Sequence, residues 1–252
     1  MNLIVEAFAW IADPAHWAGT EGIPTRIAQH LGISLLVLVI ASAIAIPLGY
    51  VIGHTGRGKG IAVPVAGGLR ALPTLGVLVL AAMSLGLGLG APLIALVILA
   101  IPSILAGAYS GLEAVDRRTV DAARSVGMTE WQILSKVEIP LGLPLLLGGL
   151  RVAALQIIAT ATLADYIGAG GLGRYIFQGV KAGDYPQMLA GSIIVIALTL
   201  LSEVLFAVLQ RVAVPRGVVL GLGRAGSGRS GFRSSSPRRP AVVGIPIDEG
   251  KK

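Results

Sequence analysis

Two glycine-rich stretches of this sequence could bind a phosphate group. Gly53 to Gly60 reads GHTGRGKG and nearly matches the phosphate loop G-x-x-x-x-G-K-[ST], in which backbone N–H groups and a lysine hold phosphates. Gly60, however, stands where that loop has the hydroxyl group that holds magnesium, and apolar segments flank the stretch on both sides. Because the motif depends on a preceding strand and a following helix, the sequence does not predict a nucleotide site here.

The second stretch, Gly168 to Gly173, reads GAGGLG and fits the dinucleotide-binding pattern G-x-G-x-x-G. That fingerprint needs a strand–helix–strand unit and an acidic residue about 20 positions later, and neither is present. We expect a non-helical loop between two membrane spans instead. The sequence has no cysteine, and its three histidines (His16, His30 and His54) share no ligand spacing. It therefore predicts a chain that is not an enzyme and uses no metal or cofactor.

The composition is typical of a membrane protein. Hydrophobic residues make up 54% of the 252 residues, charged residues make up 13%, and the mean hydropathy is +0.82. The formal net charge of +7 belongs to residues 211–252, which hold nine Lys or Arg and two Asp or Glu. This tail is rich in Gly, Ser and Pro and is predicted to be disordered. It either binds anionic membrane lipids or is simply solvated, and nucleic acid is not expected as a partner.

Five apolar segments predict an all-α membrane protein with five transmembrane helices. A helix needs about 20 apolar residues to cross a bilayer. The uncharged run from Ala71 to Leu112 is about twice that length, and GLGLGAP at Gly86 to Pro92 supplies a turn within it. The expected spans are residues 31–53, 64–86, 91–111, 141–164 and 187–210.

The distribution of cations predicts how the chain is oriented. Lys and Arg collect in the segments after the first, third and fifth spans, and cations mark the cytoplasmic side. We therefore expect a multi-pass membrane protein with its N-terminus outside and its C-terminus in the cytoplasm. The expected domains are an extracytoplasmic or interfacial segment at 1–30, a five-span domain at 31–210 and the basic tail at 211–252.

Three ionisable residues fall within the expected spans: Arg70, Arg151 and Glu203. Burying charge in a membrane is costly, so each is a functional candidate, but snorkelling or pairing with a carbonyl explains each equally well. A quaternary ammonium ligand is best held by an aromatic cage, and the aromatic residues, 5% of the chain, show no cluster. The substrate-binding residues therefore stay unassigned. G-x-x-x-G pairs occur about as often as chance predicts for 35 glycines, so they predict no helix contact.

The segment from Glu113 to Glu138 interrupts this apolar sequence with nine charged residues. The stretch Asp121 to Thr129 looks like a DNA-binding helix-turn-helix. Such a motif should be basic and supported by further helices, whereas this segment has five acids against four cations and membrane spans on both sides. We expect instead an element on which another protein docks.

Local chemistry predicts two short helices in this segment. The first begins at Asp116 or Thr119 and stops at Gly127 in the left-handed conformation. Thr129 then caps the second helix, and Gln132 completes a capping box.

The two helices offer surfaces of different kinds. Ala122 and Ala123 present almost no side chain, so another protein can approach the backbone closely. Pro140 and Pro144 are expected to bring the chain out of the second helix and into the fourth span. Four residues give the second helix an apolar side that rests on the spans or fills a groove in a partner: Trp131, Ile133, Leu134 and Val137.

The sequence DAARSVGMTEWQILSKVEIPLGLP, Asp121 to Pro144, resembles the EAA loop of ABC importer permeases, written E-A-A-x-x-x-G with a proline thirteen residues after the glycine. Gly127 and Pro140 have that spacing, and Asp121 replaces the usual glutamate with a shorter acid. The resemblance implies that residues 112–140 form a coupling helix that seats in a cleft of a cytoplasmic ATPase. It implies these ATPase-coupling residues: Asp121, Ala122, Ala123, Gly127 and Pro140.

Three further stretches are similar to permeases for compatible solutes, the glycine betaine, choline and carnitine group: DPAHWAGTEGIP, RALPTLG and IATATLADYIGAGGLG. This resemblance implies the transmembrane subunit of an ATP-driven importer. Its partners would be cytoplasmic ATPase subunits, an extracytoplasmic solute-binding protein and a second permease subunit, identical or paralogous. GAGGLG is also similar to methionine-importer permeases, so a permease for methionine or another small solute is an alternative.

A self-sufficient secondary transporter or channel is the competing class. Such a protein is expected to show inverted repeats and discontinuous spans around a site at the membrane midplane. Five spans cannot divide into two equal halves, and the sequence shows no internal repeat. The permease interpretation is therefore favoured.

Overall fold

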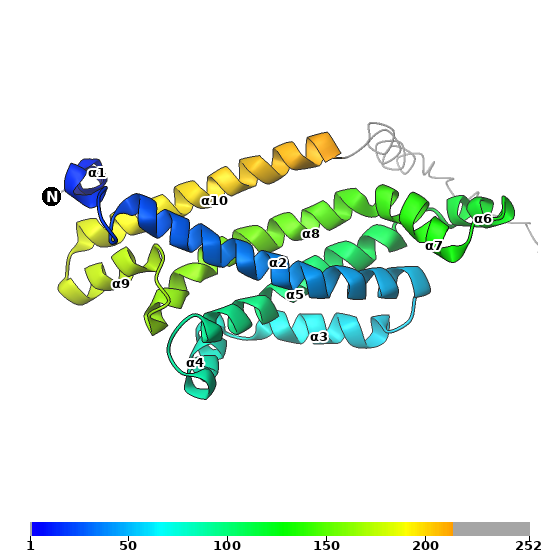
Figure 1. The fold of residues 1–252 in the computed structure, drawn as a ribbon, viewed down its shortest axis with the longest axis horizontal. Coiled ribbons are helices and arrows are strands. Elements are labelled where there is room, and N and C mark those ends of the chain that lie inside the picture. The colour runs from blue at the N-terminus through cyan, green and yellow to red at the C-terminus, as the bar shows by residue number, and fades with distance from the viewer. Residues whose placement is uncertain (1, 214–252) are drawn as a thin grey trace, which may run out of the picture. The chain divides into compact units, whose positions relative to one another are not determined.

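The computed structural model describes residues 2–213, and every regular element in that range is a helix (Figure 1). Four of these helices are long and apolar enough to cross a membrane: α2 (Ile23–Thr55), α5 (Gly90–Glu113), α8 (Ile139–Thr160) and α10 (Tyr185–Ala213). The pair α3 (Lys59–Ala71) and α4 (Thr74–Leu85) adds a fifth span if the two count together. The predicted all-α membrane fold is confirmed. From residue 214 on, the predicted basic tail lies outside the described residues.

The second span differs from the single helix predicted at 64–86. It consists of α3 and α4, which meet at an angle of 90°. Leu72 has φ −68° and ψ 130°, an extended conformation, because the ring of the following Pro73 disfavours helical backbone in the residue before it. The expected turn between the second and third spans is confirmed, since α4 ends at Leu85 and α5 begins at Gly90.

The core of the bundle lies where α2, α5 and α8 run side by side (Figure 1). Val37 and Ala41 of α2, Ile104 of α5 and Ile157 of α8 are each 2% exposed or less. These buried faces combine small and branched residues, which lets the three helices pack closely.

Glycines bring the backbones of these three helices together. A Cβ atom on Gly49 of α2 would lie 2.5 Å from the Cβ of Ala108 on α5. A Cβ atom on Gly107 of α5 would lie 2.8 Å from the Cα of Gly149 on α8. Two G-x-x-x-G pairs, 49–53 and 107–111, thus form helix contacts of the kind that needs glycine. The expectation that these pairs carry no meaning is wrong, because counting glycines does not show which face of a helix they occupy.

The other end of the bundle carries α1 (Leu3–Ala12), the 3₁₀ turn Pro14–His16 and α9 (Gly173–Ala182) (Figure 1). Residues 168–172, which hold most of the GAGGLG stretch, are non-helical as predicted. Trp10 stacks on His16 with ring centroids 3.8 Å apart and meets Tyr175 edge-on at 5.2 Å. The expectation that aromatic residues form no cluster is therefore wrong, because this cluster joins residues that are distant in the sequence.

The three ionisable residues of the spans all have partners. Arg70 donates from Nη2 to the carbonyl oxygen of Pro102 at 3.3 Å, one of the roles considered for it. Arg151 of α8 donates from Nε to Oε2 of Glu203 on α10 at 2.7 Å, and from Nη1 to Gln210 at 3.2 Å. These two charges neutralise each other within the bundle, which ties α10 to α8.

Candidate functional site

The charged segment after α5 forms a compact loop at one end of the bundle, with two short helices (Figure 1). The first, α6 (Arg117–Ser125), begins where the side chain of Asp116 accepts a hydrogen bond from the Arg118 backbone N–H at 2.9 Å. The second, α7 (Glu130–Ile133), follows after a short turn. Asp116 is therefore the N-cap, one of the two starting residues predicted.

Gly127 ends the first helix as predicted, with φ +83°. Its backbone N–H donates to the carbonyl oxygen of Arg124 at 2.9 Å, and the Met128 N–H donates to that of Ala123 at 3.2 Å. These two bonds form a Schellman motif, which requires a left-handed residue at the position of Gly127. The glycine is thus needed for its backbone conformation and not for space, since a Cβ atom there would meet nothing within 4 Å.

The predicted capping box of α7 is also present. The Thr129 side chain accepts from the Gln132 backbone N–H at 3.4 Å, and the Gln132 side chain accepts from the Thr129 N–H at 2.9 Å. The exit from α7 differs from the prediction, because Pro140 and Pro144 do not break the helix. A π-helical turn, Leu134–Glu138, leads directly into α8, and Pro140 sits in the first turn of α8. Its missing N–H is accommodated at this change of hydrogen-bond pattern.

The loop has a small core of its own. Ile133 is fully buried, and Val120 and Ala123 are 7% and 8% exposed. Three partly buried residues pack around them: Val115, Met128 and Val137. Ala123 therefore faces inward and holds α6 against α7, whereas Ala122 is exposed. Of the predicted coupling residues, Ala123 supports the shape of the loop and is not part of its outer surface.

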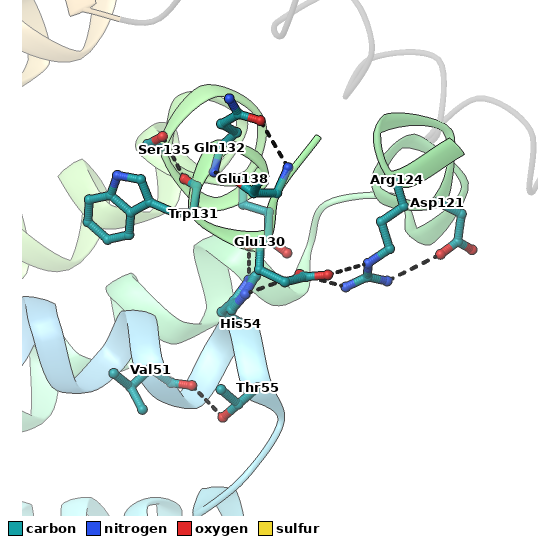
Figure 2. A network of polar contacts seen from close by, with 11 residues as sticks. Val51, His54, Thr55, Asp121, Arg124, Glu130, Trp131, Gln132, Ser135 and Glu138 are labelled. Carbon is teal, nitrogen blue, oxygen red and sulfur yellow. Dashed lines mark hydrogen bonds and ion pairs between the residues drawn. The ribbon is translucent and has the colours of Figure 1, made fainter. Parts of the chain in front are cut away.

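Several side chains of the loop are exposed. The side chain of Asp121 is 70% exposed. Val126 and Trp131 are 78% and 74% exposed, which is unusual for apolar residues of this size. Of the predicted apolar side, Ile133 and Val137 pack inside the loop, while Trp131 points away from it (Figure 2). The loop thus presents two large apolar side chains and an acid to its surroundings.

A chain of charged contacts runs through the loop (Figure 2). Arg124 donates to both carboxylate oxygens of Glu130, from Nε at 2.8 Å and from Nη2 at 3.0 Å. The same guanidinium lies 3.4 Å from Oδ1 of Asp121. The hydrogen bond to Glu130 raises the pKa of Arg124 above its ordinary value. The pair joins α6 to α7 across the glycine turn.

His54 extends this chain to the end of α2 (Figure 2). Its Nδ1 donates to Oε2 of Glu138 at 2.5 Å, and its Nε2 lies 3.5 Å from Oε2 of Glu130. Glu138 has only 8% of its side chain exposed, so this hydrogen bond lies inside the protein. Sequence reasoning missed His54, Glu130 and Glu138. The separation of 84 residues between His54 and Glu138 leaves no local signal that could have paired them.

A second ion pair holds the base of the loop. Lys59 at the start of α3 donates from Nζ to Oε1 of Glu113 at 2.5 Å, where α5 ends. Both side chains are about half exposed, so solvent screens this contact and it adds little to stability. The loop is therefore fastened to α2 mainly through His54 and is continuous with α8.

Comparison with known proteins shows what this chain is similar to. Residues 45–216 match the family described as binding-protein-dependent transport system inner membrane component. The chain is 32% identical over 193 residues to the glycine betaine/carnitine/choline transport system permease protein OpuCB of Bacillus subtilis, an alignment covering 77% of this chain and 89% of the relative. It is 35% identical over 190 residues to the carnitine transport permease protein OpuCB of Listeria monocytogenes, covering 75% of this chain and 87% of the relative.

Solved structures agree on the fold. The inward-facing methionine ABC transporter MetNI contains a chain that matches with a TM-score of 0.65 at 23% identity, over 74% of this chain and 94% of that one. An amino acid ABC transporter with histidines matches with a TM-score of 0.61 at 22% identity, over 73% of this chain and 91% of that one. At these identities the two matches show a shared architecture and nothing about the solute.

Proposed function

This chain belongs to the family of binding-protein-dependent transport system inner membrane components, and we propose that it imports small quaternary ammonium solutes of the glycine betaine, carnitine and choline type. It would be the membrane-spanning subunit of a complex in which a separate ATPase supplies the energy. The relatives that are named for these solutes, at 30–35% identity over most of the chain, support this solute class. The match to the methionine transporter is lower in identity and supports only the fold, so methionine is the second candidate.

One observation carries the coupling role of the loop. The helix that begins at Glu130 passes through the π turn and continues to Thr160 without a break, so a displacement of the loop is transmitted directly into α8. The bond from His54 to Glu138 transmits the same displacement to α2. ATP-driven closure of the ATPases would draw two such loops together and open the bundle to the outside, and hydrolysis would reset it.

Within the loop, we assign different roles to the predicted coupling residues. Asp121 and Ala122 would touch the ATPase, together with the exposed Val126 and Trp131. Three residues would shape the loop and its continuation into α8: Ala123, Gly127 and Pro140.

The proposed orientation places the loop and the chain after Ala213 in the cytoplasm, and α1 and α9 outside, in contact with a solute-binding protein. Residues 1–30 would form an interfacial segment, 31–210 the permease domain and 211–252 a cytoplasmic tail. The exposed apolar residues of α2 and α10, among them Leu35, Val39 and Leu201, fit contacts with lipid or with a second permease subunit. The pairing would be homo- or heterodimeric.

Uptake of labelled glycine betaine tests this proposal. The chain would be expressed with its neighbouring ATPase and binding-protein genes in a host that lacks its own osmolyte transporters, with choline, carnitine and methionine as competitors. Uptake that requires the ATPase and is competed by the quaternary amines is the expected result. If only methionine competes, methionine would replace the quaternary ammonium solutes as the proposed solute class. Uptake without any ATPase would refute the coupling mechanism.

A further inference from the structure

A cavity of about 500 Å³ lies outside the coupling loop, between the first half of α2, the start of α5 and the glycine loop at 168–170. Its volume falls in the range of small-molecule sites, roughly 300–1,000 Å³. One corner is polar and holds Arg26 and Gln29. The remaining side chains that line it are aliphatic: Ile33, Leu36, Leu89, Leu93 and Ala169. The cavity therefore suits a small molecule that is polar at one end and apolar at the other.

Arg26 brings a guanidinium group to the wall of this cavity, and Glu21 balances its charge. The residue is only 7% exposed, and its Nε has no hydrogen-bond partner among the described residues. Nη1 donates to Oε1 of Gln29 at 2.8 Å, and Nη2 donates to the carboxylate of Glu21. A guanidinium has five N–H groups, and the described residues accept from two of them. An arginine with unused donors at a cavity wall has the chemistry to bind a carboxylate.

The glycine loop is shaped around this polar corner. Gly170 has φ +84°, and a Cβ atom on it would lie 3.1 Å from Oε1 of Gln29 and 3.2 Å from Nη1 of Arg26. The buried His30 holds the loop in place, since its Nδ1 accepts from the Leu172 N–H at 3.4 Å and its Nε2 donates to the carbonyl oxygen of Ile158 at 2.9 Å. The polar corner is thus built before any solute enters, which reduces the cost of binding.

We propose that this cavity is a solute subsite in which Arg26, supported by Gln29, binds the carboxylate of a zwitterionic solute. The methylated end of the solute would contact Ile33, Leu36 and Leu93. This inference rests on the proposed function, and it adds a preference for solutes that carry a carboxylate. Among residues 2–213, no aromatic side chain lines the cavity, so the ammonium group is not what it recognises. Glycine betaine and carnitine carry a carboxylate and choline does not, so the cavity favours the first two.

Arg26→Gln in the full complex with its ATPase and binding protein tests this subsite. The binding protein is the same in every variant, so any change in relative uptake arises in the permease. Because Arg26→Gln removes the charge-assisted pair with the carboxylate of the solute, uptake of glycine betaine and carnitine is expected to fall roughly 10-fold or more. Choline uptake is expected to stay within about twofold, because choline makes no such pair. Arg26→Lys, which keeps the charge but loses the planar fork, is expected to restore part of the betaine uptake.

Arg174→Gln is the matched control, because Arg174 also lies beside Glu21, at 3.7 Å, and does not line the cavity. Assembly is checked for each variant by co-purification with the ATPase. Two results would overturn the carboxylate subsite and leave the proposed function intact. In one, Arg26→Gln and Arg26→Lys reduce the uptake of all three solutes equally. In the other, neither variant reduces the uptake of any solute. Uptake of none of the three by the unaltered complex would overturn the proposed function, and the subsite with it.

Discussion

The imidazole Nδ1 of His54, in the last turn of α2, lies 2.5 Å from a carboxylate oxygen of Glu138, in the π turn that leads into α8 (Figure 2). This contact joins the first span to the helix that continues out of the loop. Glu138 has only 8% of its side chain exposed, so little solvent can reach its carboxylate. The contact therefore fixes the loop to α2, in addition to its continuity with α5 and α8 and to the ion pair between Lys59 and Glu113.

His54→Ala is expected to lower the stability of the protein. It leaves the Glu138 carboxylate buried without its partner, at a cost of about 1–3 kcal/mol or more for a charged group. Thermal unfolding of the purified protein in detergent measures the effect as a lower midpoint. His54→Gln is the control. Its amide can still donate to Glu138, so its unfolding midpoint should fall less than that of His54→Ala. An unaltered midpoint in His54→Ala would show that the contact does not fasten the loop.

Gly127→Ala is expected to cost about 1–2 kcal/mol, because alanine resists the left-handed conformation that the Schellman motif requires. There is room for the added methyl group, so the loss reflects the backbone alone. Gly127→Pro cannot adopt this φ at all and should abolish ATPase association and uptake, with membrane insertion intact. Co-purification with the ATPase and solute uptake are the readouts. Full transport by Gly127→Pro would remove the coupling role of the loop.

Gly107→Ala is expected to destabilise the bundle, because the new Cβ atom would lie 2.8 Å from backbone atoms of α8. Overpacking of this kind costs about 1–3 kcal/mol. Gly148→Ala on α8 is the matched control, since the nearest atom to its Cβ is the side-chain amide nitrogen of Gln210 at 3.8 Å. That variant should be as stable as the parent protein, or more stable by up to about 1 kcal/mol through helix propensity. Equal midpoints for the two variants would argue against close α5–α8 packing.

Trp131→Ala and Ile133→Ala separate the outside of the loop from its core. Trp131 is 74% exposed, so its removal should change stability by less than about 0.5 kcal/mol while weakening ATPase association. Ile133 is fully buried, and its truncation should cost about 2–5 kcal/mol. Unfolding midpoints and ATPase co-purification measure both effects. If Trp131→Ala binds the ATPase as tightly as the parent chain, the indole is not part of the docking surface.

The parts of the loop that could be predicted are those formed by residues close to one another in the sequence. The Asp116 cap, the left-handed Gly127 and the Thr129–Gln132 capping box each involve positions within a few residues of one another. Their chemistry is the same in any protein, so it can be recognised without knowing the fold.

The features that could not be predicted depend on which distant segments meet. Nothing near His54 indicates that Glu138 is its partner, and nothing near Gly107 indicates that Gly149 faces it. The exit through Pro140 was predicted wrongly for a different reason. A proline normally ends a helix, but a π turn before it removes the hydrogen bond that the ring would have broken.

The most direct test of the account is whether the loop touches the ATPase. The sequence contains no cysteine, so a single Val126→Cys places one thiol on the loop, at a residue that is 78% exposed. Leu87→Cys, at a residue that is 83% exposed in the turn between α4 and α5, is the control, because that turn lies far from α6 and α7 (Figure 1). A thiol-directed cross-linker should join Val126→Cys to the ATPase, and an ATP analogue should change the yield, while Leu87→Cys gives no product. Cross-linking of the ATPase to Leu87→Cys and not to Val126→Cys would contradict the proposed coupling role and orientation.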